Sequence, residues 1–348
     1  MKFYKLFFII LTFFLKTETI ISDENIFYVN NIKLVKEANI SNEELTNRAI
    51  TKGFKRLGEK ILLTEDIKKL TILKQSQIKD LVSYYQIITE NDGSEKSNSI
   101  IYNIYFDKDK IHDLFFNLGI FYSEITNKEF YLLPILKKND QLFIYNKNYF
   151  YQNWNSNNQN EIIEFILLLE NIEVIQKINL EKENLMSLNL KEIFKEYSKN
   201  NYGIVLIDIS NPKREKIYLN TQILGKNISK SLNIQNIYSN KEKYYEKLIN
   251  EISLVITNLV KSQNLIDVRT PSFLNVKFKI NKRNNLEDLN KRIKKIDAIN
   301  NMYVQELNKD FVLIKLKYLG KLSKIISQLK KDRIILEQRE NEWSLKII

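Results

Sequence analysis

The strongest constraint on the fold lies in residues 270–348, where strand-like and helix-like apolar patterns follow one another in a set order. The segment FLNVKFKI alternates as a half-buried strand does, and NLEDLNKRIKKID places its apolar residues on one side of a helix. Two strands joined by a turn at 308–309, a second helix (KLSKIISQLKKD) and a final strand or hairpin complete the order βαββαβ. That order is the split βαβ pattern, so we expect a C-terminal ferredoxin-like module.

The chain ahead of this module is long enough for further domains. Hydrophobic residues make up 44% of the 348 residues, which supports buried cores and argues against disorder. A Ser41-x-x-Glu44 capping box predicts a helix start in the first block, and the second block combines buried strands with a long helix. We therefore predict a multi-domain α/β (α+β) chain of small mixed sheets with packed helices, divided into domains at 23–154, 155–268 and 269–348.

Residues 1–22 have the parts of a secretory signal peptide. Lys2 and Lys5 precede an apolar run from Leu6 to Leu15, and a polar flank follows. A helix of that length spans only about 15 Å, which is half of the hydrocarbon core of a bilayer. We predict export to the periplasm with cleavage near Ser22. An uncleaved inner-membrane anchor is the alternative.

The net charge of +12 raises the question of a nucleic-acid partner. Most of the basic residues are lysine, and only eight are arginine, the residue that binds bases and phosphates with a planar fork. Phe278 and Tyr318 lie on predicted strands of the C-terminal module, but no RNA-binding aromatic motif surrounds them. We predict no nucleic-acid partner, whereas a mildly basic surface near anionic membrane lipid or cell-wall polymer is consistent with the charge.

Composition also excludes several kinds of catalytic and cofactor site. The chain has no cysteine, which excludes disulfides, thiolate nucleophiles and thiolate metal ligands. Its single histidine, His112, has Asp109 and Asp113 as neighbours, a pattern typical of a solvated helix face. The seven glycines are not spaced as a phosphate-binding loop requires. We predict no catalytic residues, no metal, no cofactors and no small-molecule substrate.

The segment IYNKNYFYQNWNSNNQN concentrates aromatic residues among asparagines. Tyrosine and tryptophan are enriched at protein interaction sites, so Tyr149, Tyr151 and Trp154 are candidate partner contacts. The alternative is a buried seam between the first two domains that also includes Tyr145 and Phe150. A second functional hypothesis is a carbohydrate-binding or hydrolytic envelope protein that uses carboxylates together with this aromatic segment.

A set of apolar segments covers most of the chain after the export signal: the strand FYVNNIKLV, the helix NRAITKGFKRLGEKIL, the segment FYLLPILKKNDQLFIYNKNYFYQNW and the C-terminal KYLGKLSKIISQLKKD. Together these segments resemble a bacterial exported family labelled domain of unknown function 2066. The family is commonly richer in alanine and arginine in that helix, where this chain has Ile50, Lys52 and Phe54. The resemblance implies no catalytic residues, because none is assigned in the family.

These observations favour a non-enzymatic, exported envelope protein that acts in protein–protein interaction or assembly. Its expected partners are one or more envelope proteins. We expect contact through a sheet edge or a helix face, with the C-terminal module as one contact surface.

Overall fold

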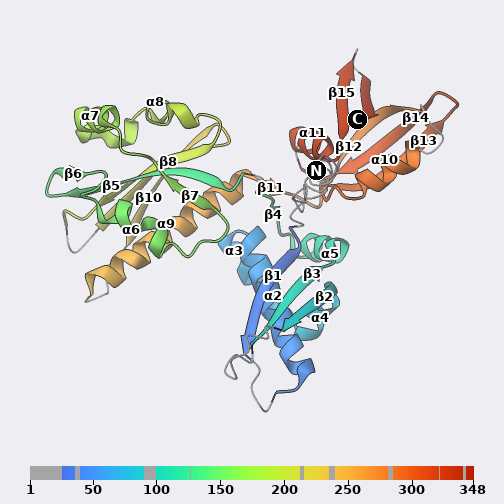
Figure 1. Cartoon of the computed structure of the whole chain (residues 1–348), viewed down its shortest axis with the longest axis horizontal. Helices are drawn as coiled ribbons and strands as arrows, with labels where there is room; N and C mark the ends of the chain where they lie inside the picture. Colours follow the sequence, from blue (N-terminus) through green and yellow to red (C-terminus); the bar gives the residue numbers. More distant parts are fainter. Residues whose placement is uncertain are drawn as a thin grey trace, which may run out of the picture.

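The computed structural model describes residues 26–35, 40–89, 99–125, 127–211, 215–234, 240–280, 285–320, 322–339 and 342–348. The predicted signal peptide at 1–22 lies outside these residues. The described chain forms three lobes around a central junction (Figure 1). We name them the N-terminal lobe (26–121), the middle lobe (127–263) and the C-terminal lobe (272–348), and the junction contains β4 (Tyr122–Ser123) and β11 (Leu265–Ile266). Small mixed sheets with packed helices confirm the predicted α/β class.

The N-terminal lobe is built on a three-stranded antiparallel sheet in the order β1-β3-β2. Its long helix, α2, begins where predicted, because the Ser41 hydroxyl accepts a hydrogen bond from the Glu44 backbone N–H at 3.1 Å. The buried stripe of α2, which includes Ala49 and Leu57, shares one core with Ile104 of β3. The elements are β1 (Tyr28–Val35), α2 (Asn42–Ile61), α3 (Thr64–Ile67), η1 (Lys68–Ile72), α4 (Gln75–Asp80), β2 (Val82–Thr89), β3 (Ser99–Phe106) and α5 (Lys108–Leu118).

The middle lobe contains a mixed sheet in the order β10-β9-β8-β5-β6, and β7 also pairs with β5. Strand β5 runs parallel to β7 and β8, whereas β8, β9 and β10 form antiparallel pairs. The strands are β5 (Glu129–Lys138), β6 (Gln141–Phe143), β7 (Glu164–Leu167), β8 (Asn201–Asp208), β9 (Glu215–Ile223) and β10 (Lys226–Ile234). The helices are α6 (Tyr149–Asn157), α7 (Ile172–Leu180), η2 (Lys182–Ser187), α8 (Leu190–Ile193), η3 (Lys195–Tyr197) and α9 (Lys241–Gln263).

This sheet corrects the predicted boundary between residues 154 and 155. The hairpin of β5 and β6 and the following helix α6 belong to the middle lobe, because β5 pairs with β8 from Phe130 to Lys137. The hairpin itself is a local feature that the sequence predicts, but its partner strand lies about seventy residues further along the chain. Pro134 lies opposite Val205 of β8, and on the other side of β5 it falls between the stretches that pair with β7 and with β6. Its missing N–H therefore removes no hydrogen bond from those two ladders.

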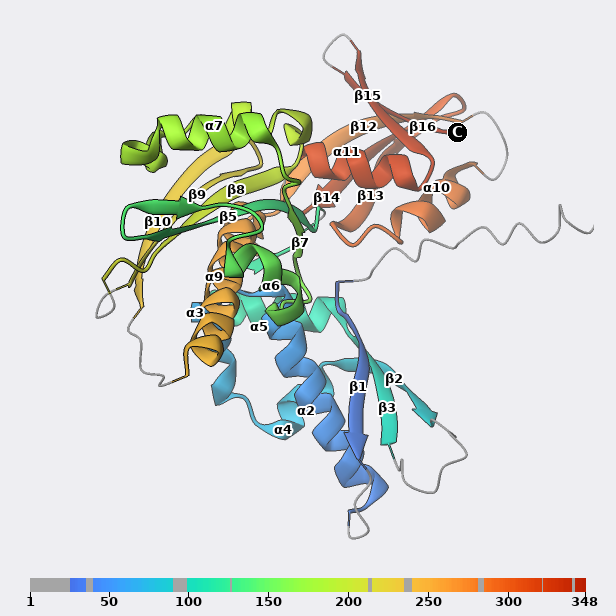
Figure 2. The same cartoon turned by 60° about the vertical axis from the view of Figure 1, so that its left-hand side comes forward.

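Both faces of the middle sheet are covered. Figures 1 and 2 show α7 and α8 over one face and α6 and α9 over the other. Successive side chains of a strand point to opposite faces, so Leu132 joins the core beneath α6 and α9 while Leu133 joins the core beneath α7 and α8. Burial on both faces explains why the chain reads here as continuous apolar runs.

The C-terminal lobe has a five-stranded sheet in the order β13-β14-β12-β16-β15. Strand β14 lies between β12 and β13 and is antiparallel to both, which is the predicted split βαβ arrangement. The last segment is a hairpin, and its second strand, β16, enters the sheet beside β12 and parallel to it. The elements are β12 (Ser272–Lys279), α10 (Asn285–Ile293), β13 (Ile299–Leu307), β14 (Phe311–Tyr318), α11 (Leu322–Lys331), β15 (Ile334–Arg339) and β16 (Glu342–Ile347).

Candidate functional site

The three lobes meet at the junction, which connects them through short, well-paired segments. β4 and β11 form an antiparallel pair in which Tyr122 lies opposite Ile266. Both side chains are buried in the core of the N-terminal lobe, and Leu319, from the end of β14 in the C-terminal lobe, enters the same core. The segments that link the lobes are therefore packed against one of them.

A large cleft opens at this junction and is lined by all three lobes. Its volume is about 1560 Å³. Its described lining combines apolar side chains with thirteen charged ones, nine basic residues and four carboxylates. The basic residues are Lys52, Lys55, Arg56, Lys60, Lys128, Lys261, Lys295, Lys324 and Lys331, and the acidic ones are Glu59, Glu124, Glu161 and Asp297.

Several of these charges hold the walls of the cleft together. Arg56 of α2 forms an ion pair with Glu161 of the middle lobe. The Lys324 ammonium of α11 lies 2.8 Å from Oε2 of Glu124, and Oε1 of the same carboxylate accepts a hydrogen bond from the Gln328 amide at 3.0 Å. The Glu124 and Lys324 side chains are mostly buried, and burial lowers the pKa of Lys324 against the opposing effect of Glu124.

Lys261 makes a buried polar contact between two lobes. Its side chain leaves α9, and its ammonium donates hydrogen bonds to the backbone carbonyls of Glu59 and, at 2.8 Å, of Leu62. These carbonyls lie at the C-terminal end of α2, where backbone acceptors lack partners within the helix and a positive charge is favoured. Desolvation lowers the pKa of Lys261 to about 8, although the nearby Glu59 opposes this effect.

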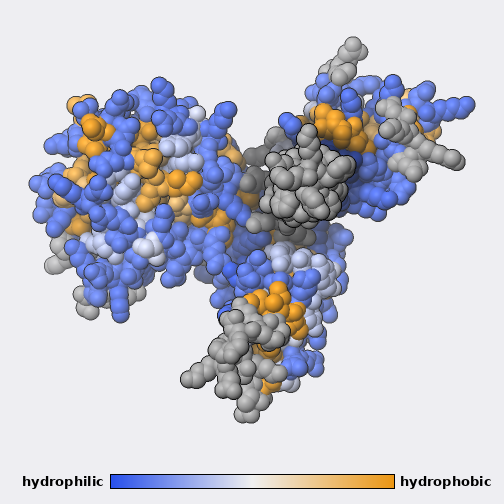
Figure 3. Space-filling model, in the orientation of Figure 1, coloured by the Kyte–Doolittle hydropathy of each residue, from blue (hydrophilic) through white to orange (hydrophobic). Residues whose placement is uncertain are grey.

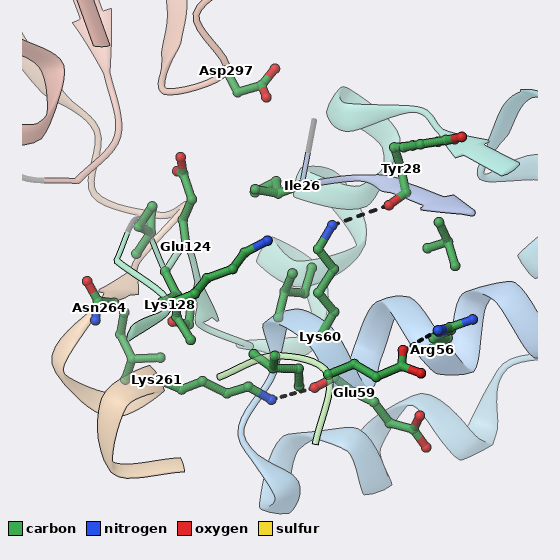
Figure 4. A pocket seen from close by; sticks show the side chains of 18 of the residues that line it. Ile26, Tyr28, Arg56, Glu59, Lys60, Glu124, Lys128, Lys261, Asn264 and Asp297 are labelled. Atoms are coloured by element: carbon green, nitrogen blue, oxygen red, sulfur yellow. Dashed lines mark hydrogen bonds and ion pairs between the residues drawn. The ribbon is translucent and has the colours of Figure 1, made fainter. Parts of the chain in front are cut away.

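The ammonium groups of other lysines lie in the open part of the cleft. Figure 4 shows the side chains of Lys60, from α2, and Lys128, from the segment ahead of β5, extending into the cleft from different walls. The Lys60 ammonium also donates to the Tyr28 carbonyl at 3.3 Å. Lys128 and Lys295 are exposed. The arrangement suits an anionic ligand, because the basic side chains exceed the carboxylates and come from three independent walls.

The volume and lining of the cleft indicate which kind of anion it can bind. Pockets that bury a small ligand have volumes of about 300–1,000 Å³ and mostly apolar linings. This cleft is larger, and its lining combines apolar side chains with an excess of basic ones, which favours an extended acidic segment over a buried small molecule. Within the described ranges, no three histidine, aspartate or glutamate side chains are grouped so that they could hold a metal ion.

The candidate aromatic contacts lie on α6, and one of them, Trp154, is buried. Trp154 and Phe150 are both 0% exposed, in the core between the middle sheet and α9. Tyr149 and Tyr151 are half-buried, and the Tyr151 hydroxyl donates to the Leu168 carbonyl at 3.0 Å. Trp154 is therefore a core residue rather than a partner contact. The segment is buried inside one lobe, not at a seam between two.

The expectation that His112 lies on a solvated helix face is wrong. The residue is 7% exposed and its ring packs against those of Phe27 and Tyr122, at centroid distances of 5.5 Å and 5.4 Å. Neither ring nitrogen has a hydrogen-bond partner among the described residues. Burial, with a smaller contribution from Lys108, lowers the pKa of His112 to about 4, so the ring is neutral at pH 7.

Phe278 and Tyr318 also lie on the buried side of their sheet. They are 1% and 7% exposed and pack in the core beneath α10 and α11. The other side of this sheet carries other aromatic side chains. Strand alternation in the sequence could have identified them once the helix-covered face was known.

Strand β2 presents apolar side chains at the edge of the N-terminal sheet. Tyr84, Tyr85, Ile87 and Ile88 are each 44–51% exposed, and apolar surface is visible on this lobe in Figure 3. The Tyr84 ring stacks on Tyr105 of β3 at a centroid distance of 4.1 Å. An exposed strand edge of this kind can accept an additional strand from another chain.

Comparisons with protein-family models, with curated proteins and with solved structures found no match. None of the helices that the structure describes is long and apolar enough to cross a membrane.

Proposed function

We propose that this protein is a non-enzymatic, exported envelope protein that binds an acidic segment of another envelope protein in the cleft among its three lobes. The observation that carries the proposal is the excess of basic over acidic side chains around a cleft of about 1560 Å³. An acidic chain segment would be attracted by the summed field of these lysines and held by ion pairs at several walls. Export rests on the basic and apolar pattern of residues 1–22.

The binding role is supported by how the charges are distributed. Lys128 lies in the middle lobe and Lys295 in the C-terminal lobe, and both are exposed in the cleft lining. A partner that contacts both would bridge two lobes, so part of its binding energy would stabilise their relative arrangement. A hydrolytic or carbohydrate-binding function has less support, because Trp154 of the aromatic segment is a core residue.

The test is zero-length crosslinking in fresh cell lysate. This reaction joins lysine side-chain amines directly to carboxylates in contact with them. We expect links from Lys128 and Lys295 to the acidic residues of one envelope protein. The double variant Lys128→Glu/Lys295→Glu has no amine at these two positions, so its readout is the links that the remaining cleft lysines, such as Lys52 and Lys331, make to the same protein, and these should be lost. The matched control is Lys226→Glu/Lys230→Glu, which reverses two exposed lysines on β10 that are not among the residues lining the cleft.

Three outcomes would count against the proposal. Links that persist in the cleft variant would show that the partner binds elsewhere. Equal loss in the cleft variant and in the β10 control would indicate a general charge effect instead of a site. Links mainly to ribosomal or nucleoid proteins would refute export.

A further inference from the structure

The sheet of the C-terminal lobe has one face that no described helix covers. Its buried face packs against α10 and α11 through residues such as Val276, Ile314 and Leu345. Side chains alternate along each strand, and paired residues point to the same side, so the opposite face can be assigned from the register. This face, which we call the open face, displays five lysines: Lys277, Lys279, Lys315, Lys317 and Lys346.

The lysines are concentrated on the two central strands of the open face. β12 and β14 contribute four of them and no carboxylate, whereas Glu306, Glu337 and Glu342 lie on the outer strands or at a strand end. The Lys277 ammonium is 3.7 Å from a Glu342 carboxylate oxygen. The centre of the open face is therefore positively charged, with acidic residues at its border.

Two aromatic rings lie between the lysines, and an ammonium group covers one face of each. Phe273 is 52% exposed, and the Lys315 ammonium lies 4.6 Å from the centre of its ring. Lys277 is placed in the same way over Phe311, at 4.5 Å. Single-stranded nucleic acid is bound on sheets by stacking bases on free ring faces, which these cation–π contacts would have to release first.

We propose that the open face binds the surface of a bilayer that contains anionic lipid. The five lysines project from one side of the sheet, so their ammonium groups can approach the phosphates of one surface, and lysines near an anionic membrane each strengthen binding. Exposed Phe273 and Tyr303 at the same face have the amphipathic or apolar character that suits the headgroup region. This surface is separate from the cleft and does not depend on the cleft binding a protein.

The proposal is tested by sedimentation of the full chain with vesicles of phosphatidylcholine alone and with roughly 30 mol % phosphatidylglycerol added. We expect binding to the mixed vesicles that falls as salt is raised, because screened lysines attract the surface less. The variant Lys279→Gln/Lys315→Gln/Lys317→Gln should bind about a hundred-fold more weakly, at roughly five-fold per lysine. The control Lys226→Gln/Lys230→Gln/Lys243→Gln removes three exposed lysines from the middle lobe and should bind like the unaltered chain.

The variants share the same N-terminal segment, so differences between them report on the substituted lysines. Circular dichroism checks that each variant is folded. Equal binding of the open-face variant and the control would overturn the proposal, as would binding that ignores anionic lipid or salt. Tight binding of a single-stranded oligonucleotide that is lost in the open-face variant, without binding to the mixed vesicles, would also overturn it and would assign the face to nucleic acid.

Discussion

Lys261 extends from α9 of the middle lobe to the end of α2 in the N-terminal lobe, and its replacement by methionine would remove this contact with little change in side-chain length. Lys261 is 2% exposed, and its ammonium donates to the carbonyls of Glu59 and Leu62. Methionine leaves both carbonyls without this donor, but it also removes a charge from a buried position. We expect these effects to offset in part, so that Lys261→Met lowers the free energy of unfolding by about 1–2 kcal/mol at pH 7.

The pH dependence gives a sharper test. Burial lowers the pKa of Lys261 from 10.5 to about 8 in the folded chain, and the unfolded chain keeps the ordinary value. Between these values the unfolded chain binds a proton that the folded chain does not, so stability rises with pH in this window. Below the folded pKa both states are protonated and the contribution is constant. The gain on going from pH 8 to pH 10.5 amounts to about 3 kcal/mol.

Methionine does not titrate, so the unaltered chain should gain about 3 kcal/mol over Lys261→Met as the pH rises through that window. The measurement is urea unfolding followed by circular dichroism at several pH values between 7 and 10.5. Lys243→Met, an exposed lysine on the same helix, is the control and should follow the unaltered chain at every pH. A difference between Lys261→Met and the unaltered chain that stays constant with pH would refute the reasoning, because it would mean that water reaches the Lys261 ammonium.

Three further substitutions test other contacts. Gly203→Ala would place a Cβ atom 2.8 Å from the backbone oxygen of Asn220, which cannot move freely within the sheet, so we expect a loss of about 1–3 kcal/mol in urea unfolding; an unchanged midpoint would contradict this packing. Trp154→Ala empties a fully buried site and should lower stability by about 3–5 kcal/mol, whereas a surface contact would lose far less. His112→Phe removes a ring whose pKa is lowered to about 4, so the unaltered chain should lose up to about 3 kcal/mol relative to this variant as pH falls from 6.5 to 4 in acid unfolding. Parallel acid-unfolding curves would show that the histidine is solvated.

The features that could be predicted from the sequence depend on residues close together in the chain. The start of α2 follows from Ser41, whose hydroxyl accepts a hydrogen bond from the backbone N–H of Glu44, only three residues further along the chain. The turn between β13 and β14 is equally local, since the Asn308 N–H donates to the Phe311 carbonyl at 3.1 Å. Strand and helix periods in residues 270–348 are properties of single elements, and their order was sufficient to predict the split βαβ arrangement.

Some pairings between strands that are distant in the sequence were not predicted correctly. β16 could have extended the outer edge of the C-terminal sheet, but it enters between β12 and β15. The hairpin of β5 and β6 joins the middle sheet through β8, which moves the domain boundary from Trp154 back to the junction. Strand patterns show which side chains are buried, but they do not say which strand supplies the neighbouring ladder.

The candidate sites depended on tertiary structure most of all. By itself, the sequence determined the local elements, the excess of lysine and the absence of cysteine chemistry. Only the folded chain brings Arg56, Lys128, Lys295 and Lys324 to one cleft, because these residues come from three lobes and share no spacing in the chain. The same is true of His112, which has charged neighbours in sequence but aromatic neighbours in space. Charge and periodicity belong to the residues of each element, whereas a shared surface belongs to the packing of elements that are distant along the chain.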